Sequence, residues 1–188
     1  MTLIGNEVRA SVDGAAIARS LMAPEAFTAV FDRHYVAVYR YLARRVGRDQ
    51  ADDLASQTFM LAFAHRGRYR DDLGTARPWL LGIATNLLRA DHRAEQRRLA
   101  TLQALGSQAS DALVTTNGHR GSTFDPALAA ALAALDSRHR DALLLHVWGE
   151  LSYAEVATAL RLPIGTVRSR ISRACAALRE TLERTSHA

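Results

Sequence analysis

Apolar side chains in the first half of the sequence recur every three or four positions, which is the spacing of an amphipathic α-helix. One such stripe covers residues 27–46, and shorter stripes cover residues 54–63 and 79–88. Pro24 and Pro78 come just before the first and third stripes, and proline is favoured in the first turn of a helix. No stretch of this region alternates between apolar and polar residues, so the pattern predicts three helices and no strand.

Two more helices are predicted in the middle of the second half. Asp125 followed by Pro126 is an N-cap with a first-turn proline, and it opens an apolar helix that ends before Asp136. Asp136 and Ser137 separate this helix from another, which covers residues 142–148. The fold class that follows is all-α.

The last part of the sequence has the pattern of a helix-turn-helix. Ser152 and Glu155 form a capping box, in which the hydroxyl and the carboxylate each satisfy a free backbone amide at the helix start. This short helix ends near Leu160, and residues 161–165 connect it tightly to a last helix. One face of the last helix is apolar, and another carries Thr166, Ser169, Arg170 and Arg173. Such an end suits the major groove, where arginine donates two hydrogen bonds to guanine; the alternative is a solvated basic face on an ordinary helix.

Charge and composition divide the chain into four segments. Residues 1–23 show no sustained pattern and are predicted to be a loose leader. Residues 24–98 hold thirteen arginines against nine acidic residues, and residues 126–188 hold eight against six. Residues 99–125 are nearly neutral and rich in polar and small residues, which is typical of a flexible linker. The prediction is therefore two small helical domains joined by a flexible linker, the C-terminal one a helix-turn-helix.

Composition narrows the classes of function. The 188 residues are 48% apolar and 23% charged, as in soluble globular proteins. The longest apolar run, residues 126–135, is far shorter than the roughly 20 residues that span a bilayer, and charges at Glu7, Arg9 and Asp13 exclude a secretory signal. We therefore expect a cytoplasmic protein without a membrane partner. A single cysteine, Cys175, excludes a disulfide framework and Cys-rich metal sites, and the net charge of +5 favours a polyanionic partner.

Two sets of residues resemble the bacterial extracytoplasmic-function (ECF) sigma factors, a group within the sigma-70 family. The C-terminal set runs over residues 149–157 and 162–174, and the N-terminal set consists of Asp52-Asp53-Leu54, Thr58-Phe59 and residues 78–88. Both sets occur in the family's order, across a polar linker, and together they cover most of residues 24–184. The resemblance implies a dissociable subunit of RNA polymerase that directs promoter recognition, promoter opening and transcription initiation. It implies no enzyme activity, no catalytic residue, no cofactor and no metal.

The resemblance also implies DNA contacts in both domains. The C-terminal domain would read the −35 element as duplex DNA through Thr166, Arg168, Ser169, Arg170 and Arg173, with Arg168 on a phosphate. In the N-terminal domain, contacts to the −10 element would fall on Trp79, Asn86, Arg89, His92 and Arg93. Trp79 has an alternative interpretation as a core aromatic, because it shares the apolar stripe of its helix. The loop from Arg66 to Arg77 is the expected place for a pocket that accepts an unstacked −10 base.

The resemblance places the polymerase clamp against Asp52, Asp53 and Gln57. The two aspartates equally suit a purely local role, because acidic residues in the first turns of a helix compensate its dipole. Relatives often have an acid where this chain has Gln57, so one charge toward a basic partner is missing. An anti-sigma factor is a further partner that the family suggests, although no residue of the sequence points to one.

Two geometric expectations follow. Relatives usually have glycine where this chain has Arg161, so a left-handed conformation there would cost on the order of 1 kcal/mol. The linker of residues 99–125 extends to roughly 89–97 Å and averages about 26–31 Å as a coil. Simultaneous contact with two promoter elements roughly 50 Å apart requires an extended linker, which favours a subunit stretched over a polymerase surface rather than a compact repressor.

Three alternative functions differ in the features that they need. A self-sufficient helix-turn-helix regulator needs a dimerisation surface and usually a sensing domain, and the first block has no obvious ligand-binding constellation. A basic helical adaptor that binds acidic proteins leaves the cationic face of the last helix unexplained. An enzyme is the weakest alternative, because the seven histidines have no paired-ligand spacing and the chain has no phosphate-binding glycine loop.

Overall fold

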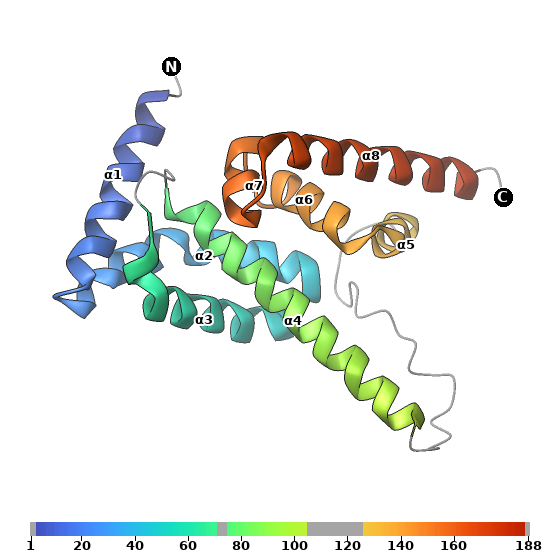
Figure 1. Ribbon diagram of the computed structural model, residues 1–188, viewed down its shortest axis with the longest axis horizontal. Helices are drawn as coiled ribbons and strands as arrows, with labels where there is room; N and C mark the ends of the chain where they lie inside the picture. Colours follow the sequence, from blue (N-terminus) through green and yellow to red (C-terminus); the bar gives the residue numbers. More distant parts are fainter. Residues whose placement is uncertain (1–2, 71–74, 105–125, 187–188) are drawn as a thin grey trace.

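The computed structural model describes residues 3–70, 75–104 and 126–186, and within these ranges the secondary structure is entirely helical (Figure 1). The helices form two bundles. The N-terminal bundle contains α1 (Leu3–Ser20), a 3-10 turn (Pro24–Phe27), α2 (Thr28–Val46), α3 (Arg48–His65), a second 3-10 turn (Arg66–Arg68) and α4 (Ala76–Ala104). The C-terminal bundle contains α5 (Pro126–Ala134), α6 (Ser137–Val147), α7 (Tyr153–Leu160) and α8 (Ile164–Ser186). The all-α prediction with a C-terminal helix-turn-helix is confirmed.

The apolar stripes of the sequence form the core of the N-terminal bundle. Val30, Val38 and Leu42 from α2 are fully buried, and α3 and α4 contribute Ala55 and Leu80. Gly47, with φ of 85°, makes the sharp turn between α2 and α3, a conformation that glycine adopts without steric cost. The core of this bundle therefore comes from the periodic pattern itself.

The prediction of a loose leader is wrong over the part of α1 whose side chains are described. Ala16, Ile17 and Ser20 are buried against the bundle. The fully buried carboxylate of Asp13 accepts hydrogen bonds from the backbone N–H of Ala76 at 2.9 Å and from His34 Nε2 at 2.7 Å, and it pairs with Arg33. The sequence hid this helix because its buried face consists mostly of small and polar residues, which give a weak hydrophobic pattern.

Local signals set the helix ends of the C-terminal bundle. The side chain of Asp136 accepts a hydrogen bond from the Arg138 N–H and caps α6, so α6 begins at Ser137 rather than at residue 142. The capping box of Ser152 and Glu155 is formed in full at the start of α7. Arg161 follows α7 in the left-handed conformation, with φ of 54° and ψ of 50°, which is the conformation expected to cost on the order of 1 kcal/mol relative to glycine.

The boundary of the predicted linker shifts in the structure. Helix α4 continues to Ala104, so residues 99–104 are helical. The remainder of the predicted linker, residues 105–125, lies outside the described residues. No helix of the described ranges is long and apolar enough to cross a membrane.

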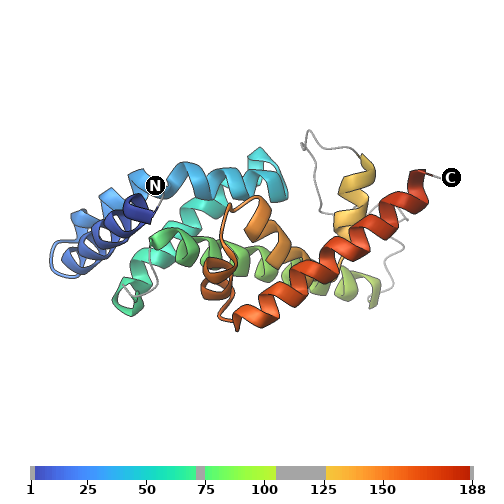
Figure 2. The same ribbon diagram turned by 90° about the horizontal axis from the view of Figure 1, so that it is seen from above.

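The two bundles pack directly against each other, with α7 against α4 (Figures 1 and 2). Gly82 of α4 faces the backbone of Ala159 in α7, and Leu81 contacts the chain at Gly149. The buried apolar residues of both bundles form one continuous cluster. In this structure α4 and α7 therefore bring matching apolar surfaces together, and the extended linker expected on a promoter stays a prediction.

Candidate nucleic-acid and polymerase interfaces

The first turns of α8 present the side chains that were predicted to read duplex DNA. Val167, Ile171 and Ala174 are buried on the inner face of the helix. The remaining surface of these turns carries the set that we call the reading face: Thr166, Arg168, Ser169, Arg170 and Arg173. Three of its members are exposed and the other two are half-buried. Thr166, Ser169, Arg170 and Arg173 recur at spacings of three and four and share one side, whereas Arg168 lies further round the helix.

The turn before α8 fixes the angle of the reading face. The Leu162 N–H donates to the Ala157 carbonyl at 2.9 Å, and the Thr166 N–H donates to the Pro163 carbonyl at 2.9 Å. Within the reading face, the Ser169 hydroxyl donates to the Thr166 carbonyl at 2.9 Å, which leaves the lone pairs of its oxygen free to accept. Arginine forks next to hydroxyl groups on one helix face can contact both guanines and phosphates in a major groove.

The residues predicted to contact the −10 element lie along α4 but do not share one environment. Asn86, Arg89 and Arg93 follow one side of the helix at spacings of three and four. Arg93 and His92 are exposed, and His92 contacts the Gln96 amide at 3.0 Å. Asn86 is also exposed and lines a groove with residues 159–161, whereas Arg89 is half-buried and binds Asp141 of the C-terminal bundle.

Trp79 is partly packed and partly accessible, so its predicted contact with DNA stays a prediction. It is half-buried and packs on the ring of Tyr69, with ring centroids 5.1 Å apart. It also lines a cavity of about 410 Å³ together with Arg68, Arg70 and Arg161. Sequence reasoning placed a pocket in the loop from Arg66 to Arg77; residues 71–74 lie outside the described part, but residues 68–70 do line this cavity.

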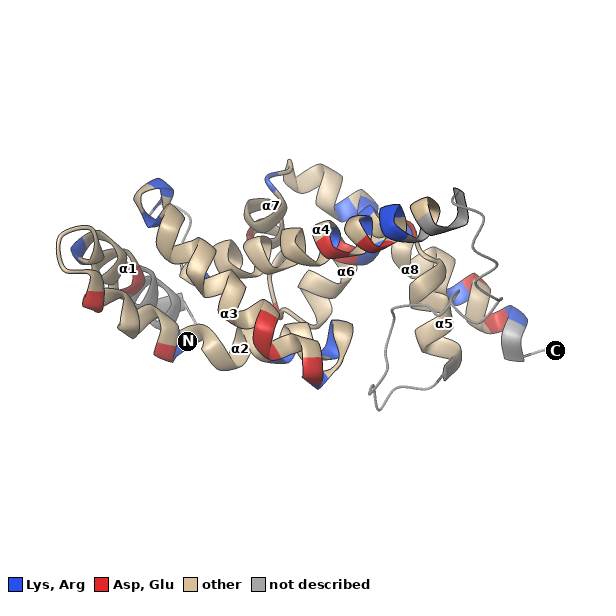
Figure 3. Cartoon of the chain, turned by 90° about the horizontal axis from the view of Figure 1, so that it is seen from below, with Lys and Arg blue, Asp and Glu red and all other residues tan. Residues whose placement is uncertain are grey.

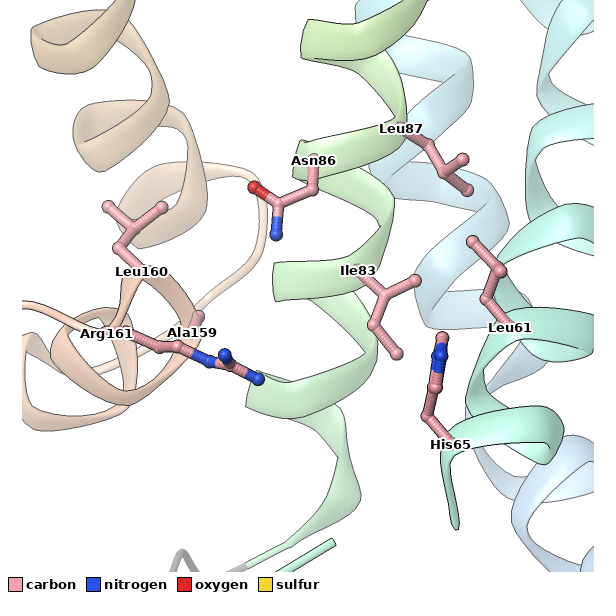
Figure 4. Close-up of a pocket in the computed structure, with 8 residues that line it drawn as sticks. All are labelled: Leu61, His65, Ile83, Asn86, Leu87, Ala159, Leu160 and Arg161. Carbon is pink, nitrogen blue, oxygen red and sulfur yellow. The ribbon is translucent and has the colours of Figure 1, made fainter. Parts of the chain in front are cut away.

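A second cavity of about 340 Å³ adjoins the first along α4 (Figure 4). Asn86 of α4 and Arg161 at the end of α7 lie on its opposite sides, with Ile83 between them and the α3 helix (Figure 4). The combined groove offers aromatic rings, an amide and guanidinium groups. Rings can stack on a nucleobase, the amide can pair with its edge, and guanidinium groups bind phosphate.

The boundary between the bundles contains a buried ionic cluster that sequence reasoning missed. Asp141 of α6 is 1% exposed, and its two carboxylate oxygens accept hydrogen bonds from Arg45 at 2.7 Å and from Arg89 at 2.6 Å. Arg45 also donates to the Tyr41 hydroxyl at 3.1 Å, which in turn hydrogen-bonds Thr85 at 2.9 Å. We call Arg45, Arg89 and Asp141 the Asp141 cluster.

The charges of this cluster compensate one another. Burial disfavours the charged form of Arg45, but Tyr41 and Asp141 outweigh that effect and raise the pKa of the guanidinium. A second, more exposed ion pair joins Arg77 of α4 to Glu150 at 3.0 Å, and this hydrogen bond lowers the pKa of Glu150. No sequence signal pairs these residues, because Asp141 lies 96 positions from Arg45 and 52 positions from Arg89.

The residues predicted to contact polymerase lie together on an exposed side of α3. Asp52, Asp53 and Gln57 are all exposed, and the acidic start of α3 is drawn in red in Figure 3. The Tyr35 hydroxyl donates to Asp52 at 2.9 Å, and this hydrogen bond raises the pKa of Tyr35.

Apolar side chains that the prediction did not include adjoin these acids. Phe31 packs on Phe59 with ring centroids 4.8 Å apart and remains 38% exposed, while Met60 is 72% exposed. The spacing of Phe31 and Tyr35, one helical turn apart on α2, is the signal that could have indicated this surface. Acidic groups around exposed apolar side chains are typical of a surface that binds another protein.

The fold and these surfaces define a DNA-binding protein with a helix-turn-helix bundle and a second helical bundle. The family described as Sigma-70 region 2 matches residues 30–98, and the family described as Sigma-70, region 4 matches residues 126–178. Over 178 residues the chain is 32% identical to the ECF RNA polymerase sigma factor SigL of Mycobacterium tuberculosis, which covers 93% of this chain and 96% of SigL. It is 32% identical over 165 residues to the RNA polymerase sigma factor CarQ of Myxococcus xanthus, covering 85% of this chain and 91% of CarQ.

Solved structures share the fold. CnrH, in complex with the cytosolic domain of CnrY, superposes with a TM-score of 0.63 at 24% identity, over 92% of this chain and 97% of that chain. The sigma factor RpoE from Bartonella quintana, in complex with the anti-sigma factor NepR, gives a TM-score of 0.63 at 24% identity, over 84% of this chain and 96% of that chain. The chain belongs to the ECF sigma factors of the sigma-70 family, which are transcription initiation factors.

Proposed function

We propose that this ECF sigma factor binds the two promoter elements and core RNA polymerase through three separate surfaces. The reading face of α8 binds the −35 element as duplex DNA, and α4 with its adjoining groove binds the opened −10 element. The exposed side of α3 with Phe31 and Met60 binds the clamp of core RNA polymerase. The observation that carries the proposal is the capped helix-turn-helix, which presents Thr166, Ser169, Arg170 and Arg173 on one face of α8, with the exposed Arg168 beside it.

Duplex recognition is supported by the charge and exposure of α8. Four arginines and no acid lie between residues 161 and 173, so a phosphate backbone meets only positive side chains there. Each neutralised phosphate releases counterions, which makes binding tight at low salt and weaker at high salt. The guanidinium groups of Arg170 and Arg173 are suited to guanine edges, and Arg168 to a phosphate.

Strand opening is supported by the groove beside α4. A base that leaves the stack costs a few kcal/mol, and stacking on a protein aromatic offsets about 1–3 kcal/mol of this. Tyr69 and Trp79 provide aromatic surface next to Arg68 and Arg70. The groove therefore has the groups that an unstacked base and its phosphates require, without a catalytic residue.

Polymerase binding is supported by the mixed character of the α3 surface. Asp52 and Asp53 give it a negative charge, and Phe31 and Met60 give it apolar contact area. Gln57 sits in the same exposed row and brings no charge. An anti-sigma factor remains a prediction from the family resemblance.

Run-off transcription with core polymerase and a library of genomic promoter fragments tests the proposal. The chain should yield discrete starts, and Arg170→Ala with Arg173→Ala should abolish them. Arg179→Ala is the matched control, because Arg179 is an exposed arginine of the same helix beyond the reading face. Failure to bind core polymerase, or full initiation by the double variant, would disprove the proposal. Specific duplex binding without polymerase would instead identify a stand-alone regulator.

A further inference from the structure

The two bundles meet through a surface that includes a proposed DNA contact. Arg89 of α4 would touch the −10 element, yet its Nε donates to Asp141 of the other bundle at 2.6 Å. Asn86, one turn earlier on α4, faces Arg161 across the groove (Figure 4). A single strand that follows α4 would have to enter where α6 and α7 already lie.

The interface is closely fitted in its apolar part. A β-carbon at position 82 would lie 2.5 Å from the carbonyl oxygen of Ala159, and one at position 149 would lie 3.1 Å from Leu81 Cδ1. Gly82 lies in the interior of α4, where glycine is a poor helix former. The close packing of α7 on α4 requires glycine at position 82, because any larger residue would push α7 away from α4.

The interface is also matched in charge. Asp141 is 1% exposed and receives one guanidinium on each carboxylate oxygen. Arg45 comes from α2 and Arg89 from α4, so a single acidic side chain of the C-terminal bundle ties together two helices of the N-terminal bundle. A buried carboxylate without such partners would be strongly unfavourable, so this geometry selects one relative placement of the bundles.

We infer that the C-terminal bundle is an intramolecular partner of the N-terminal bundle, held by the Asp141 cluster and the Gly82 contact, and that it occupies Arg89 and narrows the approach to the exposed Asn86 until promoter binding separates the two bundles. The inference rests on the proposed function for the role of α4, whereas the closed state itself rests on the interface alone. Only open molecules bind a single strand at α4. The apparent affinity for single-stranded DNA is therefore the affinity of the open state multiplied by the fraction of open molecules.

Distance measurement in the free protein tests the closed state. A fluorescent donor and acceptor are attached to Cys175, which is exposed on α8, and to a cysteine introduced on α3 by Ala64→Cys. Asp141→Asn should lower transfer efficiency by shifting the closed-to-open ratio at least about tenfold, since it leaves Arg45 uncompensated in the closed state. Glu180→Gln is the matched control, because it removes one exposed carboxylate of the same bundle away from the interface.

Gly82→Ala provides a second route to the open state. Alanine is the better helix former, so circular dichroism should show helicity at least equal to the parent while transfer efficiency falls. Gly165→Ala, at a position where a β-carbon meets nothing within 4 Å, should leave transfer efficiency unchanged. A variant that merely unfolds would lose helicity and is recognised in this way. If Asp141→Asn does not fold, Gly82→Ala still tests the closed state.

Binding of a fluorescein-labelled 20-nucleotide oligothymidine links the open state to α4. Asp141→Asn and Gly82→Ala should each tighten binding several-fold, and the two controls should not. Unchanged transfer efficiency in both interface variants, or unchanged oligonucleotide affinity in variants that open, would overturn the inference. If the variants open and bind as expected but none initiates transcription with core polymerase, the inference stands and the proposed function fails.

Discussion

The two DNA-facing surfaces differ in how the fold presents them. The reading face of α8 is turned to solvent, and local sequence signals build it: a capping box, a left-handed residue and a tight turn. The α4 surface depends on tertiary contacts at its start and near its middle, since Asp13 binds its first residue and Asp141 holds Arg89. One chain can therefore keep the arginines of its duplex-reading helix available while it holds an arginine of the other DNA-facing helix in an ion pair.

Removal of the Asp13 carboxylate should produce the largest effect on stability. In Asp13→Ala, Arg33, His34 and the Ala76 N–H lose a fully buried partner. Breaking a buried ion pair on one side typically costs about 3–5 kcal/mol. Urea unfolding should show a loss of this size, compared with little change for Asp32→Ala, which removes an exposed acid from α2. A loss below about 1 kcal/mol would show that α1 does not anchor α4.

The same carboxylate gives an expected pH dependence. Burial alone would raise the pKa of Asp13, but hydrogen bonds from His34 and Ala76 and the pairing with Arg33 outweigh burial and lower it below its ordinary value of 3.8. Because the folded-state pKa is depressed, the stabilisation is present above pH 3.8 and is lost as pH falls through the folded value. In acid unfolding, the free energy of unfolding of Asp13→Ala should therefore fall less than that of the parent chain as the pH decreases below 3.8.

Removing one arginine from the reading face of α8 and one from the α4 surface should weaken promoter binding to different extents. Arg173→Ala should weaken promoter binding by the polymerase complex by about 1–3 kcal/mol. Arg89→Ala should weaken it less, because the lost DNA contact is offset by release from Asp141. Filter binding on a promoter fragment found by run-off transcription measures both. An equal or larger loss for Arg89→Ala would contradict the difference between the two surfaces.

Replacing Arg161 in the turn before α8 with glycine should stabilise the protein. Arg161→Gly removes the strain of a left-handed arginine and should stabilise the chain by about 1 kcal/mol, or roughly 2–4 °C in Tm. Arg179→Gly, within the regular part of α8, should instead destabilise by about 1 kcal/mol. Calorimetry of both variants checks the opposite signs.

The smallest expected effect concerns the α3 surface. Because the hydrogen bond to Asp52 raises the pKa of Tyr35, Asp52→Asn should bring that pKa back toward 10.0. Asp53→Asn, on the neighbouring exposed residue, should change it less. Titration of the tyrosine ring signals by NMR would detect the shift, and equal pKa values in both variants would rule out the Tyr35–Asp52 pair.

The successes of sequence reasoning follow from interactions within one or two helical turns. The helices of residues 24–98, the capping box at Ser152 and the reading face of α8 each depend on neighbours in the chain, and each is present in the structure. The prediction of a loose leader was wrong because the buried face of α1 consists mostly of small residues around the Asp13 carboxylate. Its partners, Arg33, His34 and Ala76, lie 20 to 63 positions away.

The sequence by itself determined an all-helical chain, a cationic reading face and membership of a family. Only the tertiary structure decided that Asp141 holds Arg45 and Arg89, that Gly82 receives α7, and that the bundles close on each other. The physical reason is that periodicity and caps report which face of a helix is buried and where the helix begins. Which buried face or charge meets which other depends on shape and charge complementarity between distant segments.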